Sequence, residues 1–160
     1  MNSLIRTWPA LIGSAAALAA LHGLAGAQPT AKNVINPPGM SDTTQFGYSQ
    51  AAVVEPGTRL IFVAGQVGWT QGEANDFNSQ VDRAFVNLDA VLKASGSSVS
   101  EVVKITLLIK DHDADKLAYL GQKRRAFFGT SPPASTLIPV PVLYAPGVEF
   151  EIDAVAVARP

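Results

Sequence analysis

Apolar and polar residues alternate most clearly near the end of the chain, in residues 148–158, which read VEFEIDAVAVA. Successive side chains of a β-strand point to opposite faces of its sheet, so the segment is predicted to be a strand with one buried, apolar face. The other face carries three carboxylates, Glu149, Glu151 and Asp153. Next-nearest side chains on a strand lie roughly 6.5–7 Å apart. Glu151, in the middle, therefore feels a like charge on each side and is the candidate acid–base group, although a solvated polar face is the alternative interpretation.

Four further segments are predicted to be extended. They are residues 48–54, 59–67, 102–109 and 132–140. The segments 59–67 and 102–109 are apolar without alternation, which is typical of strands covered on both faces. Gly65 lacks a Cβ and would let a ligand or another backbone approach closely, although a glycine at a strand bend is the structural alternative. Residues 28–47 are rich in proline, glycine and polar residues, so we expect a leader and loop with little structure.

Two segments show the period of an amphipathic helix, residues 76–95 and residues 114–128. Three bases near the end of the second, Lys123, Arg124 and Arg125, complement the helix dipole and predict a solvated cap. The order β-β-α-β-α-β-β indicates a mixed α+β domain with both helices on one face of the sheet. Because the strands predicted at 59–67 and 102–109 look covered on both faces, we expect partner subunits on the second face, in a homo-oligomer.

The first 27 residues differ from the rest of the chain. Arg6 is their only charge, an apolar run follows in residues 10–24, and Ala25-Gly26-Ala27 supplies small residues before Gln28. This pattern predicts a Sec-type signal peptide cleaved near Ala27, with a retained anchor as the alternative. We therefore expect a secreted or periplasmic protein in which residues 28–160 form a single domain, with an ordered core at about 36–158.

Composition narrows the chemistry. The chain has no cysteine and only two histidines, one of them within the predicted signal peptide, which argues against disulfides, thiolate catalysis, multi-histidine metal sites and a Ser/His/Asp triad. Removal of residues 1–27 leaves 11 of the 12 basic residues against 13 acidic ones. A net charge near −2 provides no basic field for nucleic acid. We expect no metal and no cofactor.

Six short motifs occur together in this chain. They are GYSQA at 47–51, FVAGQ at 62–66, NLDAVL at 87–92, VKIT at 103–106, FFG at 127–129 followed by PPA at 132–134, and EFEIDAVA at 149–156. In this order and spacing, from about residue 36 to 158, the sequence resembles the reactive intermediate deaminase (Rid, also YjgF) family. The resemblance implies a chorismate-mutase-like fold that assembles as a homotrimer with three clefts between subunits.

The same resemblance implies a function and a site. The deaminases of this family hydrolyse a reactive imine or enamine and release ammonia and a carbonyl compound. By position, Tyr48 would line the cleft, Gly65 would offer backbone to the substrate, and Glu151 would orient or activate the water. A carboxylate there could take a proton from water and return it to the departing ammonia.

Two departures from the family pattern affect the expected substrate. Where the well-characterised deaminases have Pro-Ala-Arg-Ser-Thr, Ser135 replaces the arginine that clamps the substrate carboxylate, and Thr136 follows it. An asparagine of the cleft aligns with Asp113. Loss of one partner of a buried charge pair costs roughly 2–5 kcal/mol, so a neutral or cationic substrate is favoured over a 2-imino carboxylate unless another cation substitutes. The candidates are Arg59, Lys110, Arg124 and Arg125, none of which the sequence places in the cleft.

Two hypotheses of function remain. The first is an exported Rid-like hydrolase of an imine, an enamine or a related C–N compound, with Glu151 activating water. The alternative is a non-catalytic trimer that binds a small ligand in the same intersubunit cleft. A nuclease or a chorismate mutase is disfavoured, because the chain is slightly acidic and the sequence locates no cluster of cations for an anionic substrate.

Overall fold

The computed structural model describes residues 32–159. The predicted signal peptide, residues 1–27, lies outside the described residues. Among the helices of residues 32–159, none combines the length and hydropathy needed to cross a bilayer. The elements in chain order are β1 (Lys32–Ile35), η1 (Thr44–Phe46), β2 (Ala51–Val54), β3 (Leu60–Val67), α1 (Phe77–Ala94), η2 (Val99–Glu101), β4 (Val102–Lys110), α2 (Ala114–Phe128), β5 (Ala134–Val140) and β6 (Phe150–Val157).

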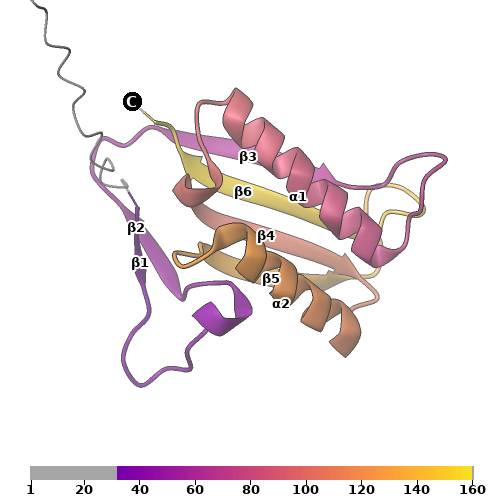
Figure 1. The fold of residues 1–160 in the computed structure, drawn as a ribbon, viewed down its shortest axis with the longest axis horizontal. Helices are drawn as coiled ribbons and strands as arrows, with labels where there is room; N and C mark the ends of the chain where they lie inside the picture. Colours follow the sequence, from indigo (N-terminus) through magenta and orange to yellow (C-terminus); the bar gives the residue numbers. More distant parts are fainter. Residues whose placement is uncertain (1–31, 160) are drawn as a thin grey trace, which may run out of the picture.

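A mixed four-stranded sheet in the order β3-β6-β4-β5 forms the centre of the domain. Strand β6 pairs antiparallel with β3 and with β4, and β5 pairs parallel with β4. Both helices lie on one face of this sheet, α1 over β3 and β6 and α2 over β4 and β5 (Figure 1). The α+β class and the placement of both helices on one face are therefore confirmed.

The N-terminal part of the described chain differs from the expectation. Residues 28–47 were predicted to have little structure, yet Lys32–Ile35 forms β1, which pairs antiparallel with β2 in a separate two-stranded sheet. The side chain of Lys32 donates hydrogen bonds to the carbonyl oxygens of Val102 and Ser131, at 2.9 and 3.0 Å. A four-residue strand is too short to show a detectable period in the sequence. It forms because pairing with a neighbouring strand stabilises it.

The core lies between the sheet and the two helices, as the alternation in β6 predicted. Phe150 and Ile152 of β6 and Leu88 of α1 are fully buried. Phe85 of α1 stacks on Phe150, with ring centroids 6.2 Å apart, and packs edge-on against both aromatic residues at the end of α2. Asp76 caps α1, because its side chain accepts a hydrogen bond from the backbone N–H of Ser79 at 3.0 Å.

The second face of the main sheet has no helix over it within the described chain. Phe62, which pairs with Val155 across β3 and β6, is 78% exposed, and Leu60 and Ile138 on the same face are also exposed. We call this surface, defined by Leu60, Phe62 and Ile138, the open face. Leu60 and Phe62 lie together on β3, whereas Ile138 lies on β5 at the opposite edge of the sheet. Exposure of a side chain as large as Phe62 agrees with the expected homo-oligomer.

Replacement of a buried residue of α1 measures how much this core contributes to the stability of the fold. Leu88→Ala should lower the free energy of unfolding by about 2–5 kcal/mol, because it leaves a cavity between α1 and the sheet. Val86→Ala, on the same helix at a residue that is 65% exposed, should change it by no more than about 0.5 kcal/mol. Urea denaturation measures the free energy of unfolding of both variants. An equal decrease in both would show that Leu88 does not belong to the core.

Candidate functional site

Glu151 lies against the backbone of Gly65 on the open face. In β6, Glu151 is in register with Val67 of β3 and Leu108 of β4, and the register between β3 and β6 shifts between Val63 and Gln66. This irregularity brings Gly65 beneath the Glu151 side chain, where a Cβ on residue 65 would collide with the carboxylate oxygen and would lie 2.6 Å from Cδ and 2.9 Å from Cγ. Only glycine leaves the carboxylate in this position.

The two acids beside Glu151 have partners of their own. Glu149 Oε2 lies 3.2 Å from the Lys116 ammonium at the start of α2. Asp153 Oδ1 accepts a hydrogen bond from the backbone N–H of Thr106 at 3.2 Å. Within residues 32–159 the side chain of Glu151 makes no hydrogen bond or ion pair, and the residue is half-buried. It is therefore the one acid of the row whose oxygens remain available to accept a proton or a hydrogen bond from a bound molecule.

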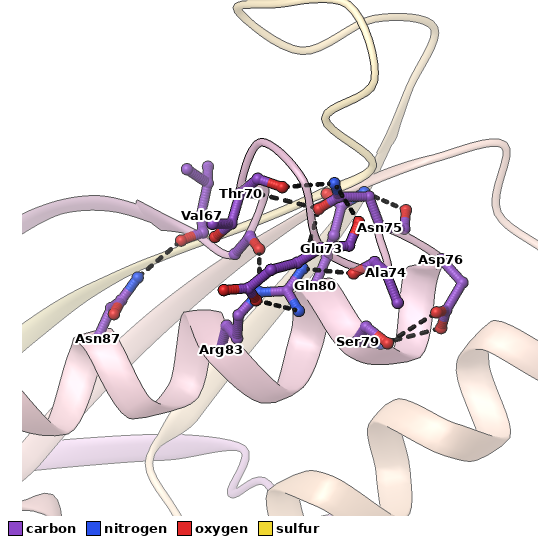
Figure 2. Close-up of polar contacts among 11 residues, drawn as sticks. Val67, Thr70, Glu73, Ala74, Asn75, Asp76, Ser79, Gln80, Arg83 and Asn87 are labelled. Carbon is purple, nitrogen blue, oxygen red and sulfur yellow. Dashed lines mark hydrogen bonds and ion pairs between the residues drawn. The ribbon is translucent and has the colours of Figure 1, made fainter.

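Polar side chains of α1 bind the backbone next to both strands that carry this pair, and Figure 2 shows those that bind the end of β3 and the loop after it. Arg83 donates to the carbonyl oxygens of Gly68 and Ala74, at 2.5 and 2.8 Å, and Asn87 donates to that of Val67 at 2.9 Å, so the end of β3 is attached to the helix. The fully buried Gln80 donates to Gly147 O at 2.9 Å and accepts from the Glu149 N–H at 3.0 Å. One helix thus positions the strand that carries Gly65 and the strand that carries Glu151.

A second cluster lies beside the edge strand β5, on the helix side. The guanidinium of Arg124 in α2 lies with Nη1 3.4 Å from Ser135 Oγ and with Cζ 5.3 Å from the centroid of the Tyr48 ring. Gly47, in the left-handed conformation at φ 75°, brings the Tyr48 segment onto α2 so closely that a Cβ there would lie 2.6 Å from Arg124 Cβ. Ser49 then joins the segment to β5, because its N–H donates to Pro133 O at 2.8 Å.

Arg124 corrects the sequence-based interpretation of the basic cluster in α2. It was expected to belong to a solvated cap, but only 4% of its surface is exposed. Burial lowers the pKa of Arg124, and Tyr48 opposes that shift. The three bases also differ in their partners, since Lys123 pairs with Asp82 at 2.6 Å and the exposed Arg125 donates to Gln45 O at 2.7 Å. Arg124 shares the stripe of Leu117, Leu120 and Phe127 at helical spacing, so the helical period agrees with its burial and the solvated-cap interpretation was wrong for this residue.

The remaining predicted residues lie outside these two clusters. Thr136 follows Ser135 but points to the opposite face of β5, where its hydroxyl accepts a hydrogen bond from Lys104 Nζ at 2.5 Å. Asp113 is exposed and caps α2 at the end remote from Arg124, accepting a hydrogen bond from the Lys116 N–H at 2.8 Å. In the isolated chain, Asp113 is therefore not brought together with Glu151 or with Ser135.

The two clusters also lie on opposite faces of the sheet. Ser135 is in register with the fully buried Ile105 and points toward the helices, whereas Glu151 lies on the open face. Glu151 is in register with Leu108, three residues further along β4, so the two clusters are offset by roughly 10 Å along the strands. A hollow of about 320 Å³, lined by Lys110 and residues 142–148, contains neither cluster. Residues 32–159 contain no group of acids and histidines that could hold a metal ion.

These features define a class of protein: a small α+β domain in which a carboxylate on the open face of the sheet lies on a strand glycine. A family model described as Endoribonuclease L-PSP matches residues 41–158. A Yersinia pestis protein of unknown function from the conserved Rid family, YyfB, superimposes with a TM-score of 0.74 at 31% identity, over 79% of this chain and 98% of that one. The chain belongs to the Rid/YjgF family, as its motifs predicted.

Two relatives of known sequence show how far the similarity extends. Protein DfrA of Myxococcus xanthus is 34% identical over 115 residues, covering 69% of this chain and 85% of that protein. A 2-iminobutanoate/2-iminopropanoate deaminase of Rattus norvegicus is 31% identical over 117 residues, covering 71% of this chain and 81% of that enzyme. The family thus includes imine deaminases.

The contact between Glu151 and residue 65 is open to a double-mutant cycle. Gly65→Ala should destabilise the protein more when Glu151 is present than in a Glu151→Ala background, with a coupling of roughly 0.5–3 kcal/mol, because the added methyl collides with the carboxylate. Gly121→Ala is the control, since a Cβ there would meet only Arg125 Nη1 at 3.7 Å. Urea denaturation of the variants measures the coupling, and a value of zero would show that the two residues do not touch.

Proposed function

We propose that this protein is a Rid-type hydrolase that converts a reactive imine or enamine into a carbonyl compound and ammonia. The observation that carries the proposal is the carboxylate of Glu151, half-buried on the open face against Gly65 and without a partner in the described chain. Membership of a family that includes imine deaminases supports it.

The reaction requires one group that accepts and then returns a proton. Water attacks the carbon of the C=N bond, Glu151 takes one proton from that water, and this proton passes to the nitrogen to give a neutral tetrahedral carbinolamine. Glu151 then takes the hydroxyl proton of the carbinolamine and transfers it to the nitrogen, the C–N bond breaks, and ammonia leaves as the C=O bond forms. An enamine enters the same sequence after it tautomerises to the imine. Positioned acid–base catalysis of this kind contributes about 10²- to 10⁴-fold.

The proposal includes a homotrimer with the site between subunits. Each chain holds one cluster on the open face and another beside the edge strand, and their offset prevents one small molecule from touching both within a chain. A neighbouring subunit packed on the open face would cover Phe62 and bring its own Tyr48 and Ser135 toward Glu151. Burial of exposed apolar surface supplies the driving force for this association.

The proposal also places the protein outside the cytoplasm, as secreted or periplasmic. This rests on residues 1–27, whose single charge, apolar run and small residues before Gln28 match a signal peptide. No metal or cofactor enters the proposed reaction, because a carboxylate and a water molecule suffice for it.

Glu151→Gln should abolish most of the turnover while the protein remains folded. The amide cannot take a proton from water, so kcat should fall by about 100-fold or more. Imines generated in situ from amino acids by an amino-acid oxidase, with ammonia release followed over time, provide the assay. Glu149→Gln is the matched control, since that acid pairs with Lys116, and it should retain its activity.

The result also separates the hydrolase from a binding protein. A fully active Glu151→Gln variant would exclude the proposed role of this residue. A wild-type protein that binds small ligands but hydrolyses no imine would favour the non-catalytic trimer instead.

Phe62→Asp should convert the trimer into a monomer. A carboxylate on the open face would be buried without a partner in the subunit contact, and that costs several kcal/mol. Val86→Asp, on the helix side of the molecule, introduces the same charge and should leave the assembly unchanged. Light scattering coupled to size exclusion measures both masses, and a wild-type protein that is monomeric at micromolar concentration would contradict the proposed intersubunit site.

A further inference from the structure

Arg124 is a buried cation without a counter-ion. Although 96% of its surface is covered, it forms no ion pair with any acid of residues 32–159. A charge removed from water in this way is costly unless an opposite charge or several hydrogen bonds compensate for it. The other two bases of the same helical turn have such partners, Asp82 for Lys123 and the Gln45 carbonyl oxygen for Arg125.

The guanidinium of Arg124 also has unused hydrogen-bond donors. A guanidinium carries five N–H groups in a planar fork. Within the described chain, Arg124 donates from Nη1 to Ser135 Oγ, at the long distance of 3.4 Å. Its Nε is enclosed without a partner. Nη2 also has no partner among the described residues but is not enclosed, so this end of the fork reaches the surface beside Ser135.

The surroundings of the fork hold it in place without neutralising it. The Tyr48 ring lies 5.3 Å from Arg124 Cζ, which is within the range of a cation–π contact, and it limits rotation of the guanidinium. Ser135 fixes Nη1 from the β5 side. Neither side chain is a carboxylate, so the guanidinium faces no acid among residues 32–159.

We propose that Arg124 is the anion anchor of the site and binds the carboxylate of a small 2-imino acid. The inference rests on the proposed hydrolase for the nature of the substrate, while the anchor itself requires only binding. The proposal reverses the expectation of a neutral or cationic substrate, which was drawn from the serine at position 135. Helix α2 supplies the missing cation, and the hydroxyl of Ser135 orients the Arg124 guanidinium.

A single carboxylate suits this cluster better than a phosphate. The fork of one guanidinium can donate two parallel hydrogen bonds to the two oxygens of a carboxylate. A phosphate dianion would require a second cation, and the neighbouring Arg125 is exposed and donates to Gln45 O. The cluster therefore offers one positive charge, which matches a monoanionic ligand.

The test measures binding rather than turnover. Isothermal titration calorimetry would compare 2-oxobutanoate, which has the shape of the imino acid but is not hydrolysed, with its uncharged methyl ester. Wild-type protein should bind the acid in clear preference to the ester, and Arg124→Gln should weaken binding of the acid by about 30-fold or more. Arg125→Gln removes the same charge one residue away and should change it by less than about threefold.

The outcomes are distinct from those of the hydrolase test. Arg124-dependent binding of 2-oxobutanoate supports the anchor even if no imine is hydrolysed. Equal affinity of the wild-type protein for acid and ester overturns it, and this comparison does not depend on whether Arg124→Gln folds. An Arg124→Gln variant that melts like the wild type and binds the acid equally well also overturns it. In the double variant Arg124→Gln/Ser135→Arg, the arginine at position 135 of β5 supplies the guanidinium instead. This variant should recover at least half of the binding free energy that Arg124→Gln loses.

Discussion

The contact between the Glu151 carboxylate and the backbone at Gly65 is the constraint on which the site depends. It exists because the register between β3 and β6 shifts between Val63 and Gln66, so that a residue without a Cβ lies beneath the acid. The network of Gln80, Arg83 and Asn87 on α1 then holds both strands to one rigid helix. These contacts fix the backbone of the two strands, and so they fix the position from which the Glu151 side chain extends.

The alternation of the sheet divides the chemistry of the chain between two faces. Side chains that point toward the helices make the core and, at the edge strand, place Ser135 beside Arg124. Side chains that point the other way place Glu151 on the same open face as the exposed Phe62, with Glu151 in register with Val67 and Leu108 and Phe62 in register with Val155. In the homotrimer that we propose, each face contributes half of the site and the association of subunits joins the halves. The same exposed surface thus accounts for both the assembly and the location of the cleft that we propose.

The location of a charge in space matters more here than the sequence position of the residue that carries it. Ser135 stands where an arginine was expected, and from the sequence alone this argued against an anionic substrate. The structure shows a guanidinium within 3.4 Å of that same serine, carried by a different element. A helix that lies over a strand can deliver a long side chain to the same point in space, and so the electrostatics of a site can persist while the residue that provides them moves along the sequence.

The periodicity of the sequence by itself determined most of the fold. The helical period placed α2 at residues 114–128, because burial of one face imposes a regular spacing over many residues. Unbroken apolar runs placed the strands β3 and β4 within a residue of their observed bounds. The motifs were sufficient to identify the family. Tertiary structure alone decided that Lys32–Ile35 is a strand, that Gly65 lies under Glu151, and that Arg124 is buried at Ser135 while Asp113 caps a distant helix end. Each of these depends on strand register or on the rotation of a helix against the sheet, which are set by contacts between segments far apart in the chain.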